Sequence, residues 1–116
     1  MPSRLMIPVL VLHTTRRNGT ACHTPLLAGT TPSGALMVMA TNFGRLEHPA
    51  WSHHLLHRPQ ASMTWRGKTL PVEARLMTIQ EQHTAQEYIL ACMPCFHDYA
   101  KRSHRDIRIF ILTPLP

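Results

Sequence analysis

The sequence has few negative charges, few aromatic residues and no basic cluster. Of its 116 residues, six are Asp or Glu and twelve are Lys or Arg, so the formal charge is +6 at pH 7. This excess of positive charge favours an anionic partner. The aromatic residues make up only 6% and do not alternate with the scattered basic residues, which argues against a surface that stacks nucleic-acid bases. A phosphorylated small molecule fits a dispersed positive charge equally well, and we expect no nucleic-acid partner.

Cysteines and long apolar runs are also scarce. The three cysteines, Cys22, Cys92 and Cys95, make an odd number, and no charged segment with an apolar run and a cleavage site precedes them. This favours reduced thiols and a cytoplasmic location. The longest apolar stretches, such as residues 5–12, are far shorter than the roughly 20 residues that a membrane-spanning helix needs. No transmembrane segment is expected.

The sequence contains enough apolar material for one core. Hydrophobic residues make up 44% of the chain and charged residues 16%, a composition that argues against disorder. A chain of this length allows one compact domain and leaves little room for a second. We therefore expect a single domain over residues 1–116.

Short apolar runs separated by turn residues predict a mainly β fold. Strands are expected at residues 5–12, 23–30, 35–41, 61–65, 69–76 and 107–113. Residues 31–34 and 66–68 have the composition of hairpin turns, and Pro8 favours an edge position for the first strand. The short connections indicate antiparallel neighbours.

Two helical insertions are expected among these strands. Pro49 suits the first turn of a helix over residues 50–57, which Arg58 and Pro59 end. Thr78 and Glu81 have the capping-box spacing, which predicts a helix over residues 79–91. About six antiparallel strands with two helical insertions indicate a small α+β barrel that closes its own edges.

Two polar turns are candidate anion sites. Residues 14–20 follow the first strand and offer hydroxyls, guanidinium groups and a flexible glycine. Residues 41–45 lead into a helix whose first N–H groups attract anions. The alternatives are a solvated turn and a plain strand-to-helix connection. A Walker loop is not indicated, because its spaced glycines and Gly-Lys pair are missing.

Other residues have both a functional and a structural interpretation. Trp51 is suited either to walling a planar ligand or to anchoring the core. His53 and His57 are four residues apart on one expected helix, and Cys92 and Cys95 have the spacing of zinc and redox motifs. Neither pair has a further ligand at a defined spacing, so we assign no metal, and a metal protein stays an alternative.

The segment after Pro94 carries further polar and aromatic side chains. Phe96, Tyr99, Ser103 and His104 could lie across the barrel mouth, where a hydroxyl would offer a proton. The alternative is one edge of a packing helix with solvated polar residues.

Together these pieces resemble the deazaflavin (coenzyme F420)-dependent nitroreductase family, which includes quinone reductases. The segments that carry the resemblance are residues 12–19, 24–27, 40–45, 48–51, 53–55, 98–99 and 109–114. The resemblance implies a split β-barrel related to proteins that bind flavin mononucleotide (FMN), often as a homodimer. It also implies hydride transfer from reduced deazaflavin to a small-molecule electron acceptor: a quinone, a nitroaromatic or an activated alkene.

The resemblance implies roles for individual residues. The cofactor-binding residues would be Arg16, Arg17, Asn18 and Gly19 for the phosphate and acidic tail, Thr24 and Pro25 for the floor, Thr41, Asn42 and Gly44 for the ring or linker, and Trp51 beside the ring. The substrate pocket would be formed by Met93, Phe96 and Tyr99. Tyr99 would be the catalytic proton donor.

The sequence departs from the family pattern at a few positions. Cys22 stands where an arginine is usual, and Met93 and Phe96 stand where better-studied relatives have tyrosines. These departures motivate an alternative function, a non-catalytic module that carries a flavin- or haem-type ligand on the same barrel. FMN is the alternative cofactor.

Overall fold

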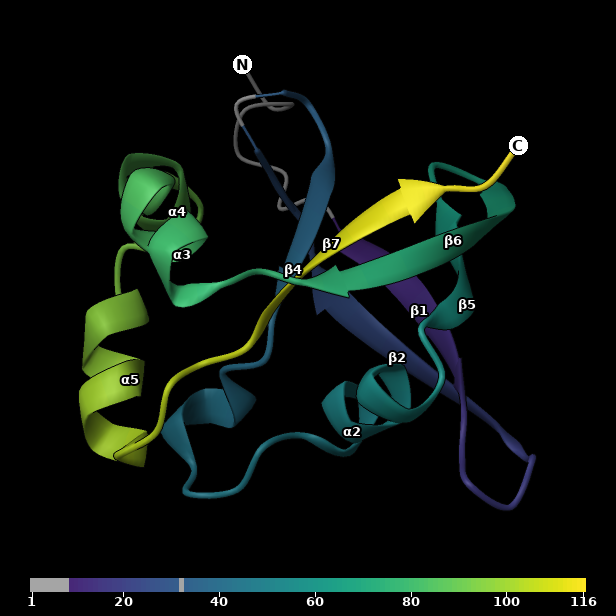
Figure 1. Cartoon of the computed structure of the whole chain (residues 1–116), viewed down its shortest axis with the longest axis horizontal. Coiled ribbons are helices and arrows are strands. Elements are labelled where there is room, and N and C mark those ends of the chain that lie inside the picture. The colour runs from purple at the N-terminus through teal and green to yellow at the C-terminus, as the bar shows by residue number, and fades with distance from the viewer. Residues whose placement is uncertain (1–8, 32) are drawn as a thin grey trace.

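The computed structural model describes residues 9–31 and 33–116 (Figure 1). Its strands are β1 (Val9–Thr15), β2 (Ala21–Leu27), β3 (Gly29–Thr30), β4 (Leu36–Met39), β5 (Gln60–Trp65), β6 (Lys68–Leu76) and β7 (Ile109–Pro114). The helices are a 3-10 turn, η1 (Asn42–Gly44), and the α-helices α2 (Ala50–His57), α3 (Ile79–Thr84), α4 (Gln86–Cys92) and α5 (Phe96–Ser103). None of the helices in the described part of the chain has the length and apolar character needed to cross a bilayer.

The seven strands of the described part of the chain belong to one antiparallel sheet in the order β2-β1-β5-β6-β7-β4-β3. β2 stands at one edge of this order, yet it contacts β4 near the other edge, so the sheet curls into a barrel. One helical insertion, with η1 and α2, follows β4, and the other, with α3 to α5, follows β6. Figure 1 shows α3, α4 and α5 gathered on one side of the sheet. The predicted mainly β split barrel with two helical insertions is confirmed.

The first two strands differ from the prediction in extent and position. β1 ends at Thr15, and residues 5–8 of the predicted strand, Pro8 among them, lie outside the described residues. β1 pairs with both β2 and β5, so the predicted edge position is wrong. Among the strands of residues 9–31 and 33–116, the edges are β2 and β3. β2 tolerates Pro25 because these residues give it a hydrogen-bonded neighbour on one side only. The predicted strand over residues 23–30 is interrupted at Ala28, which separates β2 from the two-residue β3.

Both predicted hairpins are present. β3 pairs with β4, with Gly29 opposite Met37, and the Gly34 N–H donates to the Thr31 carbonyl across the turn (2.9 Å). β5 and β6 are joined by Arg66 and Gly67 alone, one residue fewer than predicted. Both residues have positive φ angles, 53° and 81°, as the tight turns that match strand twist require.

The predicted helix over residues 79–91 is broken in two. The capping box is confirmed: the Glu81 N–H donates to the Thr78 hydroxyl, and the Thr78 N–H donates to the Glu81 carboxylate. The break falls at Ala85, which is buried. It allows α4 to bury Ile89 although α3 buries no residue.

The buried residues form two clusters on either side of the sheet. The barrel cluster contains Leu10, Leu12, Val38, Ala40, Trp51, Leu55, Met63, Val72, Ala74, Phe110 and Leu112. The helix cluster contains Met37, Met77, Ala85, Ile89, Phe96, Ile107 and Ile109. β7 contributes to both clusters, which explains its nearly continuous apolar sequence, because a strand covered on both faces does not alternate.

Candidate functional site

A pocket of about 360 Å³ opens between the end of β2, β4, the η1 turn and the helices α4 and α5. Its volume lies within the range of small-molecule sites, roughly 300–1,000 Å³. Its lining includes the predicted site residues Thr24, Pro25, Thr41, Asn42, Trp51, Met93 and Tyr99. The structure therefore brings together residues that are far apart in the sequence, some of which the resemblance assigns to the cofactor site and two of which, Met93 and Tyr99, it assigns to the substrate pocket.

No charged side chain of the described residues lines this pocket. The polar side-chain groups of the lining residues are threonine hydroxyls, one amide, one indole N–H, one thiol and one phenol. The remaining lining is aliphatic, aromatic or sulfur-containing. Such a surface favours a planar, largely apolar and uncharged ring, and it disfavours a phosphate or carboxylate inside the pocket.

The η1 turn forms one wall of the pocket with a left-handed backbone. Asn42, Phe43 and Gly44 have φ angles of 48°, 56° and 76°. Within the turn, the Gly44 N–H donates to the Thr41 carbonyl (2.9 Å) and the Arg45 N–H donates to the Asn42 carbonyl (3.1 Å). Such a conformation is costly for residues other than glycine and is concentrated at functional sites.

Gly44 itself is buried behind this wall and does not line the pocket. A Cβ atom at this position would lie 3.0 Å from Arg102 Cδ and 3.1 Å from Tyr99 Cδ1. The predicted contact of Gly44 with the cofactor is therefore not seen in the pocket lining, and its observed role is one of space, because a Cβ atom here would crowd α5.

Trp51 anchors the core, as one of the two interpretations predicted, and it also lines the pocket. Its side chain is 5% exposed and packs against Phe110 in the barrel cluster, with ring centroids 5.9 Å apart. α2 thus anchors the core and closes the pocket with the same ring.

The turn with Arg16, Arg17, Asn18 and Gly19 lies outside the pocket lining. All four residues are exposed, at the tip of the β1–β2 hairpin. Asn18 Oδ1 accepts from the N–H (3.0 Å) and hydroxyl (2.8 Å) of Thr20, and the Arg16 guanidinium donates to the same hydroxyl at 3.2 Å. With a rise of about 3.4 Å per residue, the tip stands on the order of 15 Å from the pocket along β2.

The predicted substrate residues separate into two groups. Met93 and Tyr99 line the pocket, whereas Phe96 is buried in the helix cluster and does not line it. Ser103 is also buried, and its hydroxyl donates to the Ala100 carbonyl (3.1 Å). His104 ends α5 in the left-handed conformation. The segment is thus a packed helix that presents only part of one face to the pocket.

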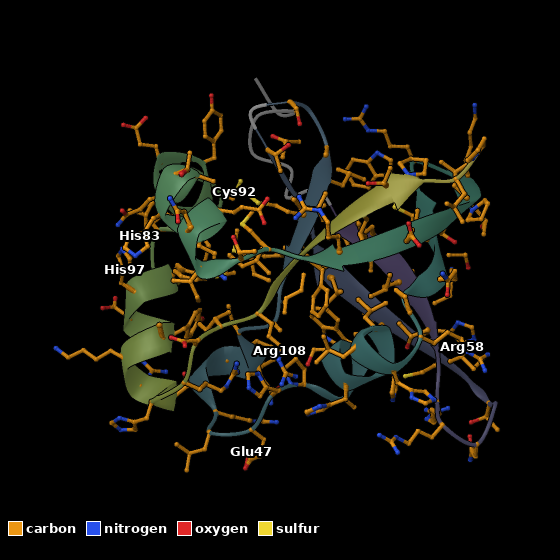
Figure 2. All side chains as sticks on the ribbon, in the orientation of Figure 1. Glu47, Arg58, His83, Cys92, His97 and Arg108 are labelled. Atoms are coloured by element: carbon orange, nitrogen blue, oxygen red, sulfur yellow. The ribbon has the colours of Figure 1, made fainter. Side chains whose placement is uncertain are left out.

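The residues considered for a metal are dispersed. Within residues 9–31 and 33–116, no group of three or more His, Cys, Asp or Glu side chains is placed to hold a metal ion. His53 Nδ1 lies 3.4 Å from Arg108 Nη1, and His57 is exposed. Cys92 and Cys95 are free thiols, and Cys92 lines the pocket from α4 (Figure 2).

Two histidines, His48 before α2 and His54 within it, have lowered pKa values. Burial lowers the pKa of His48 from its usual 6.5, and the nearby Arg108, Arg105 and His53 lower it further. Burial also lowers the pKa of His54, with smaller contributions from Arg16 and His53. Both rings are therefore neutral at pH 7, and His54 Nδ1 forms a hydrogen bond with the Thr14 hydroxyl (2.9 Å).

Several pocket residues were not identified from the sequence. They are Leu26, Leu27, Ala28, Gly29, Met37, Met39, Phe43, Pro49 and Cys92. Most are apolar, and an apolar residue that lines a pocket looks like any core residue in a sequence. Phe43 is the one that could most easily have been predicted, because it stands between Asn42 and Gly44, two residues that were assigned to the site.

Known structures share this fold. A structure described as an F420-H2 dependent reductase (FDR-A) superposes with a TM-score of 0.77 at 24% identity, covering 90% of this chain and 93% of that chain. A protein described as a domain-swapped dimer gives the same score and identity over 90% of this chain and 79% of its own. HutZ, a haem storage protein from Vibrio cholerae, has a TM-score of 0.68 at 16% identity, covering 97% of this chain and 85% of its own. At these identities the likeness shows the fold.

The sequence itself supplies the family. A family model described as F420H(2)-dependent quinone reductase matches residues 2–114, nearly the whole chain. The match includes the β1–β2 hairpin, the left-handed turn, α2 and the strands that place them around the pocket. The chain therefore belongs to the F420H2-dependent quinone reductase family, a family of oxidoreductases that use coenzyme F420.

Proposed function

We propose that this protein transfers a hydride from reduced F420 to a quinone, a nitroaromatic or an activated alkene. The observation that carries the proposal is the uncharged pocket between the left-handed turn and Trp51, in a chain of this family. The residues present fit a deazaflavin ring, because the pocket offers an indole, threonine hydroxyls and an amide, and no charge that would have to be desolvated. The bound cofactor would supply the hydride, and the protein would bind and orient the cofactor and the acceptor.

We assign the cofactor ring to the floor and walls of the pocket. Thr24 and Pro25 lie on the floor, Thr41 and Asn42 belong to the left-handed turn, and Trp51 closes the side. These residues bind and orient the ring, and orientation is the main contribution that a protein makes to such a reaction.

We assign the acidic tail of the cofactor to the exposed hairpin tip. Arg16 and Arg17 are charged and accessible there, which suits a phosphate and carboxylates that remain partly hydrated. The net charge of +6 adds a steering effect toward a polyanion.

We assign the acceptor to the side of the pocket formed by α4 and α5. Met93 supplies an adaptable apolar contact, and Tyr99 supplies the one phenol in the lining. The Tyr99 hydroxyl is the proposed proton donor to the reduced acceptor.

The alternative is a binding module without turnover, for a flavin- or haem-type ligand. The similarity in fold to HutZ motivates it. The pocket lining of the described residues includes no histidine to ligate a haem iron, so we rank it second.

Three further assignments accompany the proposal. We expect a homodimer, because a protein of similar fold is a domain-swapped dimer, and the exposed Val9 and Leu27 lie opposite each other on neighbouring strands of the sheet. We expect a cytoplasmic location, because all three cysteines are free. We expect no nucleic-acid partner, since the basic residues are scattered.

The deciding experiment is a titration of the purified protein with F420 and, separately, with FMN, followed by turnover with reduced F420 and a quinone or nitro compound. We expect micromolar binding of F420, weaker binding of FMN, and steady-state oxidation of the reduced cofactor. Tight binding of FMN or haem without turnover would select the alternative. Failure to bind both F420 and FMN would refute the proposed function, and failure to bind haem as well in the same titration would refute the alternative.

A further inference from the structure

Arg105, which follows α5, directs its guanidinium group to backbone carbonyls at both ends of the left-handed turn. Its Nη1 donates to the Ala40 carbonyl (3.0 Å), its Nη2 to the Thr41 carbonyl (2.8 Å) and its Nε to the Arg45 carbonyl (3.2 Å). All three nitrogens of the side chain are therefore committed to one segment of backbone. A planar guanidinium presents its donors in a rigid fork, so one side chain fixes the separation of carbonyls that lie five residues apart.

The turn requires an external support of this kind. Asn42 and Phe43 both adopt positive φ angles, which residues with a Cβ atom rarely adopt, and Phe43 is 75% exposed and so gains little from burial. Only two backbone hydrogen bonds close the turn from within. The contacts that compensate for the conformation come from outside the segment.

α5 supports the same turn from its other side. Gly44 is packed against Tyr99 and Arg102, so that an added Cβ atom would crowd both side chains. The turn is thus held between α5, which carries the proposed proton donor, and the guanidinium of Arg105. The pocket wall and the acceptor side of the pocket share one support.

The surroundings of Arg105 indicate that it binds backbone groups and does not form an ion pair. No carboxylate of the described residues forms a salt bridge with it. Burial, and then the neighbouring Arg108, lower the pKa of Arg105, whereas Glu47 acts in the opposite direction. Nη1 also lies 3.1 Å from His48 Nδ1, a ring whose lowered pKa keeps it neutral and able to accept.

We propose that Arg105 is a positioning residue of the cofactor pocket. It holds residues 42–44 in the left-handed conformation, which places Asn42 and Phe43 in the pocket lining. The effect on ligand binding rests on the proposed function, whereas the effect on the turn itself does not.

The first test measures the affinity for F420 in Arg105→Gln, Arg105→Lys and Arg105→Ala. We expect the Kd to rise about tenfold in Arg105→Gln and less in Arg105→Lys, because hydrogen bonds from a charged donor are lost or misaligned. We expect kcat at saturating cofactor to change little, and millimolar guanidinium chloride to restore binding to Arg105→Ala. Arg108→Gln is the matched control, since Arg108 (Figure 2) bonds to Ser52 and not to the turn, and its Kd should equal that of the wild type.

The second test needs no ligand. Amide hydrogen exchange at Gly44 and Arg45, whose N–H groups close the turn, should quicken in Arg105→Gln while exchange in β1, β5 and β6 stays unchanged. If Arg105→Gln and Arg105→Ala do not fold, Arg105→Lys alone decides, with faster exchange expected in the turn.

The outcomes separate the two proposals. If the wild type does not bind F420, the proposed function fails, and the exchange measurement still decides the role of Arg105. Unchanged exchange in the turn of any folded Arg105 variant overturns the positioning role, as does an Arg108→Gln variant that is impaired to the same degree.

Discussion

The 41–45 turn and the 16–19 turn have similar compositions, but the fold holds them in different ways. Each contains asparagine, glycine and arginine. In the first turn, Gly44 is packed against α5, and the Thr41 and Arg45 carbonyls at its two ends accept from Arg105. In the second, a Cβ atom on Gly19 would meet no atom within 4 Å, and the side-chain bonds of Arg16 and Asn18 stay within the hairpin. A rigid wall suits a planar ring, whereas an adaptable charged tip suits a flexible, hydrated tail.

The largest effect should come from a substitution of Trp51, which connects the pocket wall near the 41–45 turn to the barrel cluster. We expect Trp51→Ala to lower the free energy of unfolding by about 3–5 kcal/mol, because a nearly buried aromatic ring is lost and a cavity remains. Urea denaturation measures this. Trp65→Ala is the control: Trp65 is only partly buried, and a loss of equal size there would contradict the assignment.

The next effect should fall on the chemical step. We expect Tyr99→Phe to reduce kcat about 100-fold at unchanged Kd for F420, because general acid catalysis contributes at least this factor. Steady-state kinetics with a quinone acceptor measures it. Tyr88→Phe removes the same hydroxyl from an exposed tyrosine on α4 and should leave kcat unchanged. Equal rates in both variants would remove Tyr99 from the mechanism.

The comparison is tested most directly by the same substitution in both turns. Gly19 and Gly44 both have positive φ angles, 89° and 76°. Gly19→Ala should cost about 1 kcal/mol, the strain of a left-handed alanine, and Gly44→Ala about 2 kcal/mol or more, because the methyl group also displaces Tyr99 or Arg102. Thermal or urea unfolding measures both. Equal costs would show that the two turns are held alike.

Removal of charge from the hairpin tip should affect affinity and leave stability nearly unchanged. We expect the double variant Arg16→Ala/Arg17→Ala to bind F420 about tenfold more weakly at low salt, with a smaller difference at high salt, because exposed charges are screened. Titrations at two ionic strengths measure this. Arg66→Ala/Lys68→Ala removes the same charge from the β5–β6 hairpin and serves as the control. A loss of affinity that does not depend on salt would contradict a role of these arginines in attracting the charged tail of the cofactor.

The smallest effect concerns His54, which links α2 to β1 through Thr14. Its pKa is lowered, so the folded state binds this proton more weakly than the unfolded state. The contribution of the neutral ring to stability is therefore complete above pH 6.5 and is lost as the pH falls through the lowered value. Arg16→Ala should raise the pKa of His54 slightly in an NMR titration. A His54 that titrates at or above 6.5 in the wild type would contradict this account.

Much of the barrel could be predicted from local patterns. The hairpins at residues 31–34 and 66–67, the helix over residues 50–57 and the capping box at Thr78 each depend on neighbouring residues, so the sequence shows them directly. The break at Ala85 could not be predicted, because it depends on where the sheet lies and on which face of α4 must be buried against it. The edge position of β2 depends in the same way on strand order.

The part of the candidate site that could be predicted consists of polar residues, glycines and Trp51 in recognisable turns and motifs. Thr24, Thr41, Asn42 and Trp51 do line one pocket. The apolar lining, such as Met37 and Met39, and the helical burial of Phe96 were not predictable, because the sequence does not distinguish a side chain that faces a pocket from one that faces the core. Arg105 lies 60 residues from the Arg45 carbonyl that it binds, and no local pattern connects them.

The sequence by itself determined the family, the strands and the turn residues, because collinear motifs and short-range sterics are local properties of the chain. Only the tertiary structure decided that the 41–45 turn forms a wall of the pocket and the 16–19 turn stays in solvent. The physical reason is that a costly left-handed backbone persists only where distant groups, here Arg105 and the face of α5, contribute enough contacts to hold it.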